Sequence, residues 1–459
     1  MNRRDFIKLS LGSMMFKMQR TGIGQNLRAP DILVIVTGQH NAQALSFLGN
    51  PHVSTPHIDQ LARTGVVFLH AYCAQPLCTP SWMAMFTGKM PHETGITINK
   101  SGHRGSSVMA ANLLSRAGYD TAYLGNWYFP ISHHEKSIHG FAQLKYTCGN
   151  RSDNHLASAF LEVLKTKRKN PFFLVASFVN PHDISWWVKG NHGSQGSYIK
   201  PPPANECPPL PDNFLPPLDE PTVLRLIQTF APKLFSSAEW TPKQWRQYLW
   251  GYYRLIETVD KQIGQLLHVL QENGDPENTL IFFTSDHGEG AAGHRWNHAQ
   301  ALYEQVIRVP LIISHPGMDA HINETHLVST GLDLLPTWCD LASIECADGY
   351  LGNSLKPLLN HSAERLNWRE FIVSETEFCS DLKSHGIYGR MLRTARYKYI
   401  IYSTGANREQ LFDLVNDPGE SQSLVRHKEF ATDLWHHRRL LRQWCRETDD
   451  PFYRFLGTS

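Results

Sequence analysis

The chain has 459 residues, more than one ordinary domain needs, although large α/β domains reach this size. Its 44 basic and 42 acidic residues nearly cancel, so the charge balance argues against a nucleic-acid-binding protein. No apolar run reaches the roughly 18 residues of a membrane-spanning helix, so we expect no transmembrane anchor. The eight cysteines form no C-x-x-C pair and no zinc-finger spacing, and we interpret most of them as buried thiols.

The N-terminal segment has the pattern of a targeting signal. Arg3 and Arg4 are followed by Phe6, Ile7 and Lys8, an order that resembles a twin-arginine export signal. The apolar region after it is short and is interrupted by basic residues. We therefore expect residues 1–27 to be an export signal of a periplasmic or exported protein. The alternative is a basic, frayed N-terminus on a cytoplasmic one.

Continuous apolar runs predict strands that are buried on both faces of a mostly parallel sheet. These runs are residues 32–37, 66–72, 119–124, 171–179, 279–284 and 308–313. Helical spacing of apolar residues predicts the helices between them. These helices are residues 56–64, 109–117, 154–167, 240–273 and 327–342. The alternation predicts an α/β fold with helices flanking the sheet.

Polar residues of chemical interest follow several of the predicted strands. Gln39 follows the first strand, His182 follows the run that ends at residue 179, and Asp286 and His287 follow the run that ends at residue 284. Open α/β sheets bind ligands at the carboxyl ends of their strands. Asp beside His is a partial site for a divalent ion, to which Gln39 can add a carbonyl oxygen but no charge. A plain turn at Gly38 and a satisfied loop histidine at position 182 are the alternatives.

Cys78 lies between the strand-like residues 66–72 and an apolar stretch, residues 83–86, that can open a helix. The unpaired N–H groups and the dipole at a helix start would stabilise a thiolate or a bound oxyanion there. A buried structural cysteine fits the same position.

We expect a second structural unit to begin after residue 355. Residues 393–401 and 410–414 predict two strands, and residues 428–447 predict a basic helix that contains tryptophan. We expect residues 28–355 to form one α/β domain of catalytic type and residues 356–459 to form a C-terminal α+β subdomain.

The segment around Cys78 resembles the signature of the formylglycine-dependent sulfatases, which belong to the alkaline-phosphatase-like superfamily. The matching residues, from C-x-P-x-R and T-G-x-x-P-H, are Cys78, Pro80, Ser81, Thr87, Gly88, Pro91 and His92. An intact S-D-H-G at residues 285–288 and R-V-P-L-I-I at 308–313 extend the resemblance, which spans residues 31–425. It implies a large, mostly parallel sheet flanked by helices, followed by a small antiparallel sheet with a helix.

The resemblance also implies an activity, the hydrolysis of sulfate monoesters of a small molecule or a glycan. In this family the cysteine is oxidised to formylglycine, whose hydrated aldehyde is the nucleophile, and a divalent metal polarises the sulfate. Carried over to this sequence, Cys78 and His182 are the catalytic residues. Gln39, Asp286 and His287 are the metal ligands, and the expected ion is Ca²⁺.

Several positions depart from the family pattern. Gly38 replaces a metal-binding Asp, Trp82 replaces the Arg of the motif, Asn126 and Tyr128 replace the Lys and His of G-K-W-H, and Ala299 replaces a sulfate-binding Lys. The candidate substrate-binding residues are therefore Trp82, Asn126, Tyr128 and His298, and the side chains considered as substitutes for the lost ones are His92, His182, His294, His298 and Arg295.

Two functional hypotheses follow from these departures. Removing one charge-stabilising donor typically costs about 2.7–4 kcal/mol, so we expect a divergent sulfatase with reduced turnover. The alternative is a catalytically inactive, sulfatase-like binding or scaffold protein, in which Trp82 suits an apolar or sugar face better than a sulfate.

Overall fold

The computed structural model describes residues 29–457 except 100–106, 147–151, 167, 189–199, 232–234, 347–348, 361–366 and 381. The predicted export signal, residues 1–27, lies outside the described residues. Among the helices of the described part, none combines the length and the apolar character that crossing a membrane requires.

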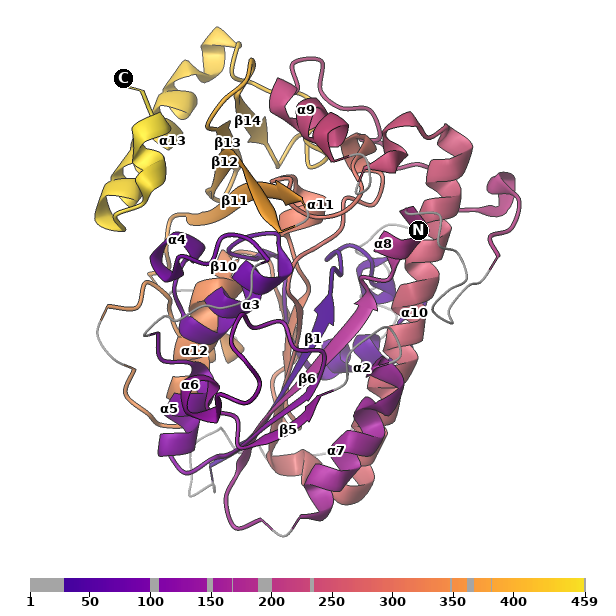
Figure 1. Ribbon diagram of the computed structural model, residues 1–459, viewed down its shortest axis with the longest axis vertical. Coiled ribbons are helices and arrows are strands. Elements are labelled where there is room, and N and C mark those ends of the chain that lie inside the picture. Colours follow the sequence, from indigo (N-terminus) through magenta and orange to yellow (C-terminus); the bar gives the residue numbers. More distant parts are fainter. Residues whose placement is uncertain are drawn as a thin grey trace.

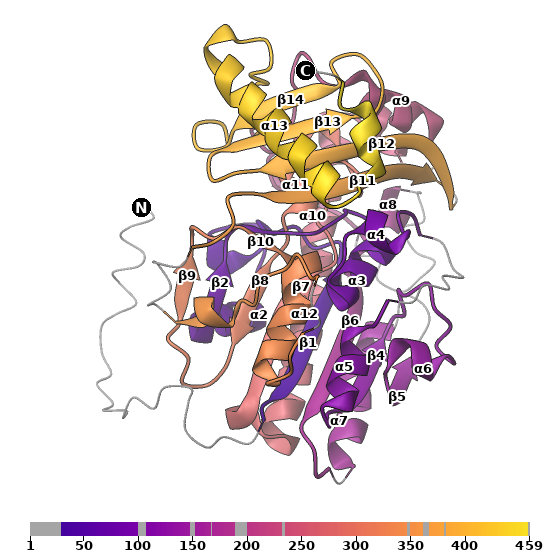
Figure 2. The same cartoon turned by 90° about the vertical axis from the view of Figure 1, so that its left-hand side faces the viewer.

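The core of the molecule is an eight-stranded sheet in the order β5-β4-β6-β1-β7-β8-β2-β9 (Figures 1 and 2). The bounds are β1 Asp31–Gly38, β2 Gly65–Phe68, β4 Asp120–Gly125, β5 Gln143–Tyr146, β6 Phe172–Pro181, β7 Thr279–Ser285, β8 Leu311–Ser314 and β9 His321–Asn323. Strand β8 runs antiparallel to β7 and β2, whereas the other neighbouring pairs are parallel. The predicted mostly parallel sheet is therefore confirmed.

Helices cover both faces of this sheet, because successive side chains of its strands point to opposite sides. Leu33 and Ile35 of β1 share a buried cluster with α2 (Pro56–Thr64), α7 (Leu156–Lys165) and α10 (Pro242–Asn273). The intervening residues of β1 share another cluster with α3, α5 and α12 (Figure 2). The remaining helices of this part are α3 Cys78–Thr87, α4 Pro91–Thr94, α5 Ala110–Arg116, α6 Lys136–His139, α8 Ile184–Val188, α9 Thr222–Phe230, α11 Glu304–Ile307 and α12 Thr330–Leu341.

A second, antiparallel sheet follows in the order β11-β12-β13-β14 and is covered by α13 (Figure 2). Its elements are β11 Ile372–Ser380, β12 Lys383–Arg393, β13 Tyr397–Tyr402, β14 Glu409–Asp413 and α13 Ala431–Glu447. Lys398 of β13 is fully buried, and its Nζ lies 3.2 Å from Glu304 Oε1 of α11 and 2.7 Å from Glu420 Oε1. The predicted small C-terminal sheet with a helix is thus confirmed, and a buried ion-pair network joins it to the larger part.

Three local predictions were wrong. Residues 66–72 form two strands, β2 and β3 (Ala71–Tyr72), and β3 pairs with β10 (Val328–Ser329) in a separate two-stranded sheet. Residues 393–401 contain a hairpin turn, in which the Thr394 N–H donates to the Tyr397 carbonyl at 2.9 Å. The apolar pattern runs through both breaks, so it does not reveal them. Helix α3 begins at Cys78 itself, five residues before the predicted apolar stretch.

Candidate active site

The ends of β1 and β7 are tied together, which places the predicted metal-binding residues side by side. The two strands are parallel neighbours, with Thr37 opposite Ser285. The backbone N–H of Gln39 donates to Asp286 Oδ1 at 2.8 Å, and the backbone N–H of Asp286 donates to the Thr37 carbonyl at 3.2 Å. Gln39 and Asp286 are fully buried.

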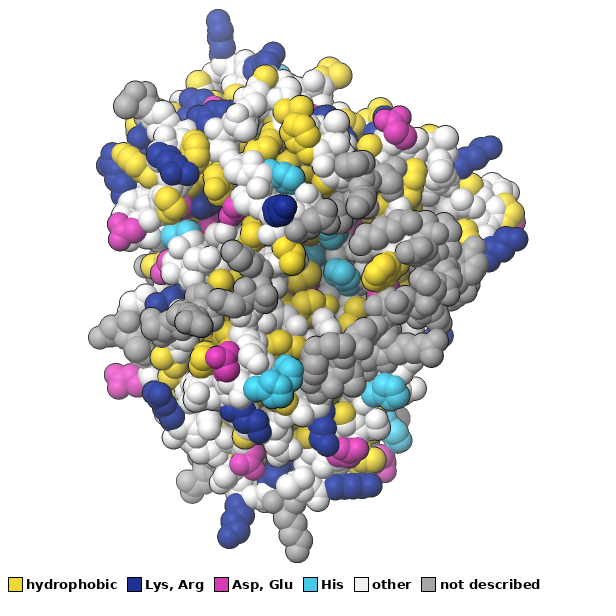
Figure 3. All heavy atoms as spheres, in the orientation of Figure 1, with side chains coloured by type: hydrophobic (Ala, Val, Ile, Leu, Met, Phe, Trp, Pro, Cys, Tyr) yellow, Lys and Arg dark blue, Asp and Glu magenta, His cyan; other side chains and the backbone are white. Residues whose placement is uncertain are grey.

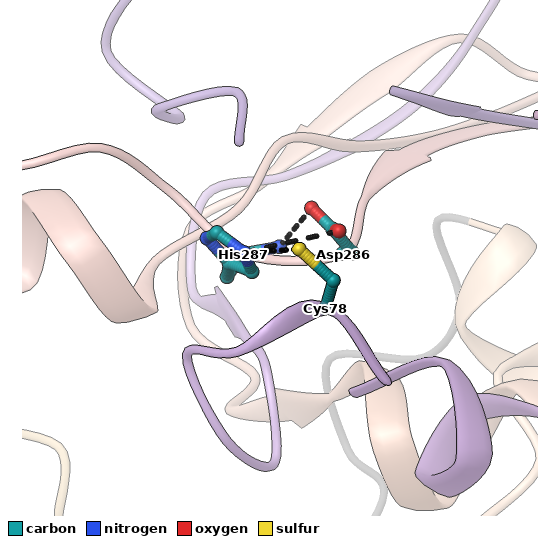
Figure 4. Close-up of side chains that lie close together, drawn as sticks. All are labelled: Cys78, Asp286 and His287. Carbon is teal, nitrogen blue, oxygen red and sulfur yellow. Dashed lines mark hydrogen bonds and ion pairs between the residues drawn. The ribbon is translucent and has the colours of Figure 1, made fainter. Parts of the chain in front are cut away.

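Cys78 reaches the same place from the first position of α3 (Figure 4). Its Sγ lies 3.3 Å from His287 Nε2, and the ligand atoms of Cys78, Asp286 and His287 all lie within 4.8 Å of one another. The structure therefore brings these three predicted side chains together. Burial and the Asp286 charge raise the pKa of the Cys78 thiol, so the expected stabilisation of a thiolate by the helix start does not prevail.

Hydrogen bonds to the surrounding backbone hold one side-chain atom of His287 and one of Asp286 in place. His287 Nδ1 lies 2.8 Å from the Gly288 carbonyl, which can only accept, so Nδ1 carries a proton and Nε2 is the ring atom that faces Cys78. Asp286 Oδ1 accepts from two backbone N–H groups, those of Gln39 and His287. Asp286 Oδ2, 3.8 Å from His287 Nε2, has no hydrogen-bond partner within the described part of the chain.

Gln39 contributes a second buried oxygen of this kind. Its Nε2 donates to the Glu289 carboxylate, and its Oε1 is buried without a hydrogen-bond partner among the described residues. A buried acceptor left unsatisfied costs about 1–3 kcal/mol. A divalent cation bound beside either oxygen would satisfy it, and amide, carboxylate and imidazole groups are ligands for such ions, so the donor set of Gln39, Asp286 and His287 fits one.

Glu289 is a further residue of the site that the sequence analysis missed. It is buried, and it accepts hydrogen bonds from the Tyr248 hydroxyl, from Gln39 Nε2 and, at 2.5 Å, from the His298 backbone N–H. All these partners are donors, so they fit an ionised carboxylate, while burial acts in the opposite direction and raises the pKa of Glu289. The sequence feature that could have identified Glu289 is its position two residues after His287, in the loop that follows β7.

The predicted residues Asn126, Tyr128 and His182 lie at the neighbouring strand ends. A Cβ added to Gly38 would lie 3.3 Å from His182 Cβ and 3.5 Å from the Tyr128 hydroxyl, so these side chains fill the space beside β1. Burial, with Cys78 and Asp286 nearby, raises the pKa of Tyr128, which keeps its hydroxyl protonated as a donor.

Trp82 is packed inside an aromatic cluster next to Tyr128. Only 1% of the residue is exposed, and its ring stacks on Phe86 at 5.6 Å and on Tyr128 at 5.5 Å between centroids. Aromatic packing surrounds its ring, while its Nε1–H has no hydrogen-bond partner among the described residues, so substrate binding by Trp82 stays a prediction.

Three other side chains were considered as substitutes for the missing cationic residues, and each lies in a different environment. His298 lines a small hollow together with Gln39 and Glu289. His294 is stacked on Tyr303 at 3.9 Å, and burial, with nearby cationic groups, lowers its pKa to about 3, so it carries no charge at neutral pH. The Arg295 guanidinium lies over the Phe214 ring at 5.4 Å. In Figure 3 the described Lys and Arg side chains are scattered over the face rather than gathered at its centre.

His92, another suggested substitute, is bound to the C-terminal part. Its Nδ1 pairs with the Glu375 carboxylate of β11, and its Nε2 lies 3.0 Å from the Thr448 carbonyl. Burial by itself would lower the pKa of His92, but the hydrogen bond and charge of Glu375 outweigh it and raise the pKa to about 9. His92 is thus a charged structural link, and the suggestion that it acts at Cys78 was wrong.

Alkaline pH is expected to weaken the fold through His92. Its pKa is about 9 in the folded state against 6.5 ordinarily, so its stabilising effect is full below pH 6.5 and is lost as the pH rises through about 9. The shift corresponds to about 3 kcal/mol of unfolding free energy. Urea unfolding between about pH 6 and about pH 9.5 should show this loss in the wild type and a much smaller one in His92→Gln. Equal pH dependence in the two proteins would contradict the assignment.

The mostly parallel sheet, with a cysteine, a carboxylate and an imidazole gathered at its strand ends, agrees with an alkaline-phosphatase-like fold. The chain belongs to the sulfatase family, because the family model "Sulfatase" matches residues 30–344. A second model, "N-sulphoglucosamine sulphohydrolase, C-terminal", matches residues 292–444. This membership supports sulfate ester hydrolysis as the general activity.

Individual relatives agree with the family assignment. The chain is 30% identical to a Delta 4,5-hexuronate-2-O-sulfatase of Bacteroides thetaiotaomicron, over 92% of this chain and 90% of the relative. It is 28% identical to an ulvan-active sulfatase of Formosa agariphila, over 88% of this chain and 78% of the relative. The solved structure of a 2-O GAG sulfatase superposes with a TM-score of 0.80 at 28% identity, covering 94% of this chain and 95% of that one.

Proposed function

We propose that this protein hydrolyses sulfate monoesters of a saccharide, at a reduced rate, with Cys78 at the reacting position. The observation that carries the proposal is the approach of Cys78 Sγ to His287 Nε2, 3.3 Å, beside Asp286 Oδ2, which has no hydrogen-bond partner among the described residues. The names of the relatives, a hexuronate 2-O-sulfatase and a 2-O GAG sulfatase, support a sulfated saccharide as the substrate class. The twin-arginine-like N-terminus supports export to the periplasm or beyond.

We propose a separate chemical role for each residue of the site. When present, the aldehyde made from Cys78 supplies the nucleophile, and a divalent cation, which we propose to be Ca²⁺, polarises the sulfate. Asp286, His287 and Gln39 would hold that cation. His182 lies at the neighbouring strand end, where it can exchange a proton with the bridging oxygen of the ester, and the Tyr128 hydroxyl donates a hydrogen bond.

The same geometry supports reduced turnover. The position of the motif Arg is taken by Trp82, whose ring is locked in the aromatic core. Asn126 and Tyr128 offer neutral donors in place of charged ones, and a neutral hydrogen bond is roughly half as strong as a charge-assisted one. The burial of Trp82 also favours the second candidate function, a catalytically inactive sulfatase-like binding protein.

Chemical state and turnover decide between the two functions. The protein is expressed with a formylglycine-forming enzyme, the Cys78 peptide is analysed by mass spectrometry, and an aryl sulfate and sulfated disaccharides are assayed. Conversion of the thiol to the aldehyde together with turnover supports the hydrolase. An unmodified thiol without turnover contradicts it and leaves the binding protein.

Removal of the cation should abolish whatever turnover is measured. We expect EDTA to eliminate activity and to lower the thermal midpoint of the wild type, because Asp286 Oδ2 and Gln39 Oε1 lose their partner. In Asp286→Asn the difference between EDTA and calcium should vanish. Glu272→Gln, an exposed change on α10, is the control with the same loss of charge and should behave as the wild type. Full turnover in EDTA would exclude a cation-dependent site.

A further inference from the structure

The space beside Gly38 is too small for the aspartate that the family pattern has at this position. A Cβ on Gly38 would lie 2.6 Å from the Val179 carbonyl oxygen of β6, closer than side chains approach backbone atoms. The same Cβ would meet His182 and Tyr128. A carboxylate therefore does not fit at residue 38 without a shift of the two strand ends, and the described strand ends leave Asp286 as the acidic side chain beside Cys78.

A second carboxylate lies on the other side of Gln39. Glu289 comes from the loop after β7, and its Oε2 accepts from Gln39 Nε2. This bond decides how the amide is oriented, because only the nitrogen can donate to a carboxylate. The amide oxygen is thereby turned away from Glu289, and it is buried without a hydrogen-bond partner in the part of the chain that the structure describes.

Glu289 is itself held in place from several directions. Tyr248 of α10 donates its hydroxyl, and the backbone N–H of His298 donates at 2.5 Å. The backbone N–H of Ala291 lies 3.4 Å from the same oxygen, Oε1. One carboxylate oxygen is thus anchored by the surrounding loop and helix, and the other is reserved for Gln39.

We infer that Glu289 is a positioning residue of the proposed cation site, which it serves by orienting the Gln39 amide. Through the hydrogen bond it polarises the amide and strengthens Gln39 Oε1 as a ligand for a hard cation. The inference rests on the proposed function, since it presupposes that a divalent ion binds to Gln39, Asp286 and His287. Partners of metal ligands typically contribute 10–100-fold to metal affinity.

Calcium titration of the full chain tests this role without any activity assay. Isothermal titration calorimetry with calcium chloride compares the wild type, Glu289→Gln and the charge-matched control Glu272→Gln. We expect Glu289→Gln to bind calcium about 10- to 100-fold more weakly and the control to bind as the wild type does. The thermal midpoint in EDTA reports the fold alone and should stay close to that of the wild type, while the rise produced by calcium should shrink.

The outcomes separate the two claims. Equal calcium affinity in the wild type and Glu289→Gln overturns the role of Glu289 and leaves the cation site standing. A wild type that binds no calcium overturns the cation site, and the role of Glu289 falls with it. If Glu289→Gln does not fold, Tyr248→Phe serves in its place, because it removes one hydroxyl that anchors Glu289. A few-fold weaker calcium binding in Tyr248→Phe supports the inference, and unchanged binding overturns it.

Discussion

Cys78→Ala is expected to reduce sulfate ester turnover to the uncatalysed level, a loss of at least about a thousandfold. Cys78 supplies the sulfur from which the nucleophile is made, and it stands 3.3 Å from His287 Nε2, next to the proposed cation ligands. Alanine keeps the helical position and removes one sulfur atom from a residue that is 6% exposed, so the fold should persist. Initial rates on an aryl sulfate, with circular dichroism as a check on folding, measure the effect.

Cys73→Ala is the matched control for this experiment. Cys73 is also a buried free thiol, and it lies five residues before Cys78 on the same connection. Its backbone N–H donates to the Ile307 carbonyl, so alanine keeps that hydrogen bond. We expect Cys73→Ala to retain wild-type turnover. If Cys78→Ala retained it as well, the nucleophile would have to be another residue, and the proposed hydrolase mechanism would be wrong.

The buried strands and their carboxyl ends could be predicted from sequence because the signal is local. Runs such as residues 32–37 and 279–284 are apolar and β-branched, and residues that follow such runs meet at one edge of a parallel sheet. The approach of Cys78 to His287 followed from this reasoning together with the family resemblance. The family resemblance also predicted the small antiparallel sheet near the C-terminus.

Interactions between distant segments could not be predicted in the same way. Whether Trp82 faces a ligand or the core depends on Phe86, one turn further along α3, and on Tyr128, which is 46 positions away. The partner of His92 lies on β11, and no periodic pattern links Glu375 to residue 92. Glu289 was overlooked for a different reason: a carboxylate in a loop is usually exposed, and its burial against α10 appears only in the fold.

Trp82→Arg, the change that restores the motif arginine, is expected to destabilise the fold rather than to restore activity. The indole is surrounded by four aromatic rings, and the replacement loses this packing and places a cation among them. The rings are those of Phe86, Tyr123, Tyr128 and Phe129, with centroids 5.5–5.9 Å from that of Trp82. Loss of a buried tryptophan alone costs about 3–5 kcal/mol, and an unpaired buried charge adds to it.

Since a domain is typically stable by only about 5–15 kcal/mol, Trp82→Arg should have a much lower thermal midpoint and a low soluble yield. Trp82→Phe keeps an aromatic ring in the cluster and should lose much less stability, which separates the effect of charge from that of volume. Thermal unfolding of the three proteins, with turnover measured on any soluble fraction, tests the argument. A stable Trp82→Arg with higher turnover would show that the aromatic cluster can open to admit a guanidinium, and that one of the lost charges can be restored by a single substitution.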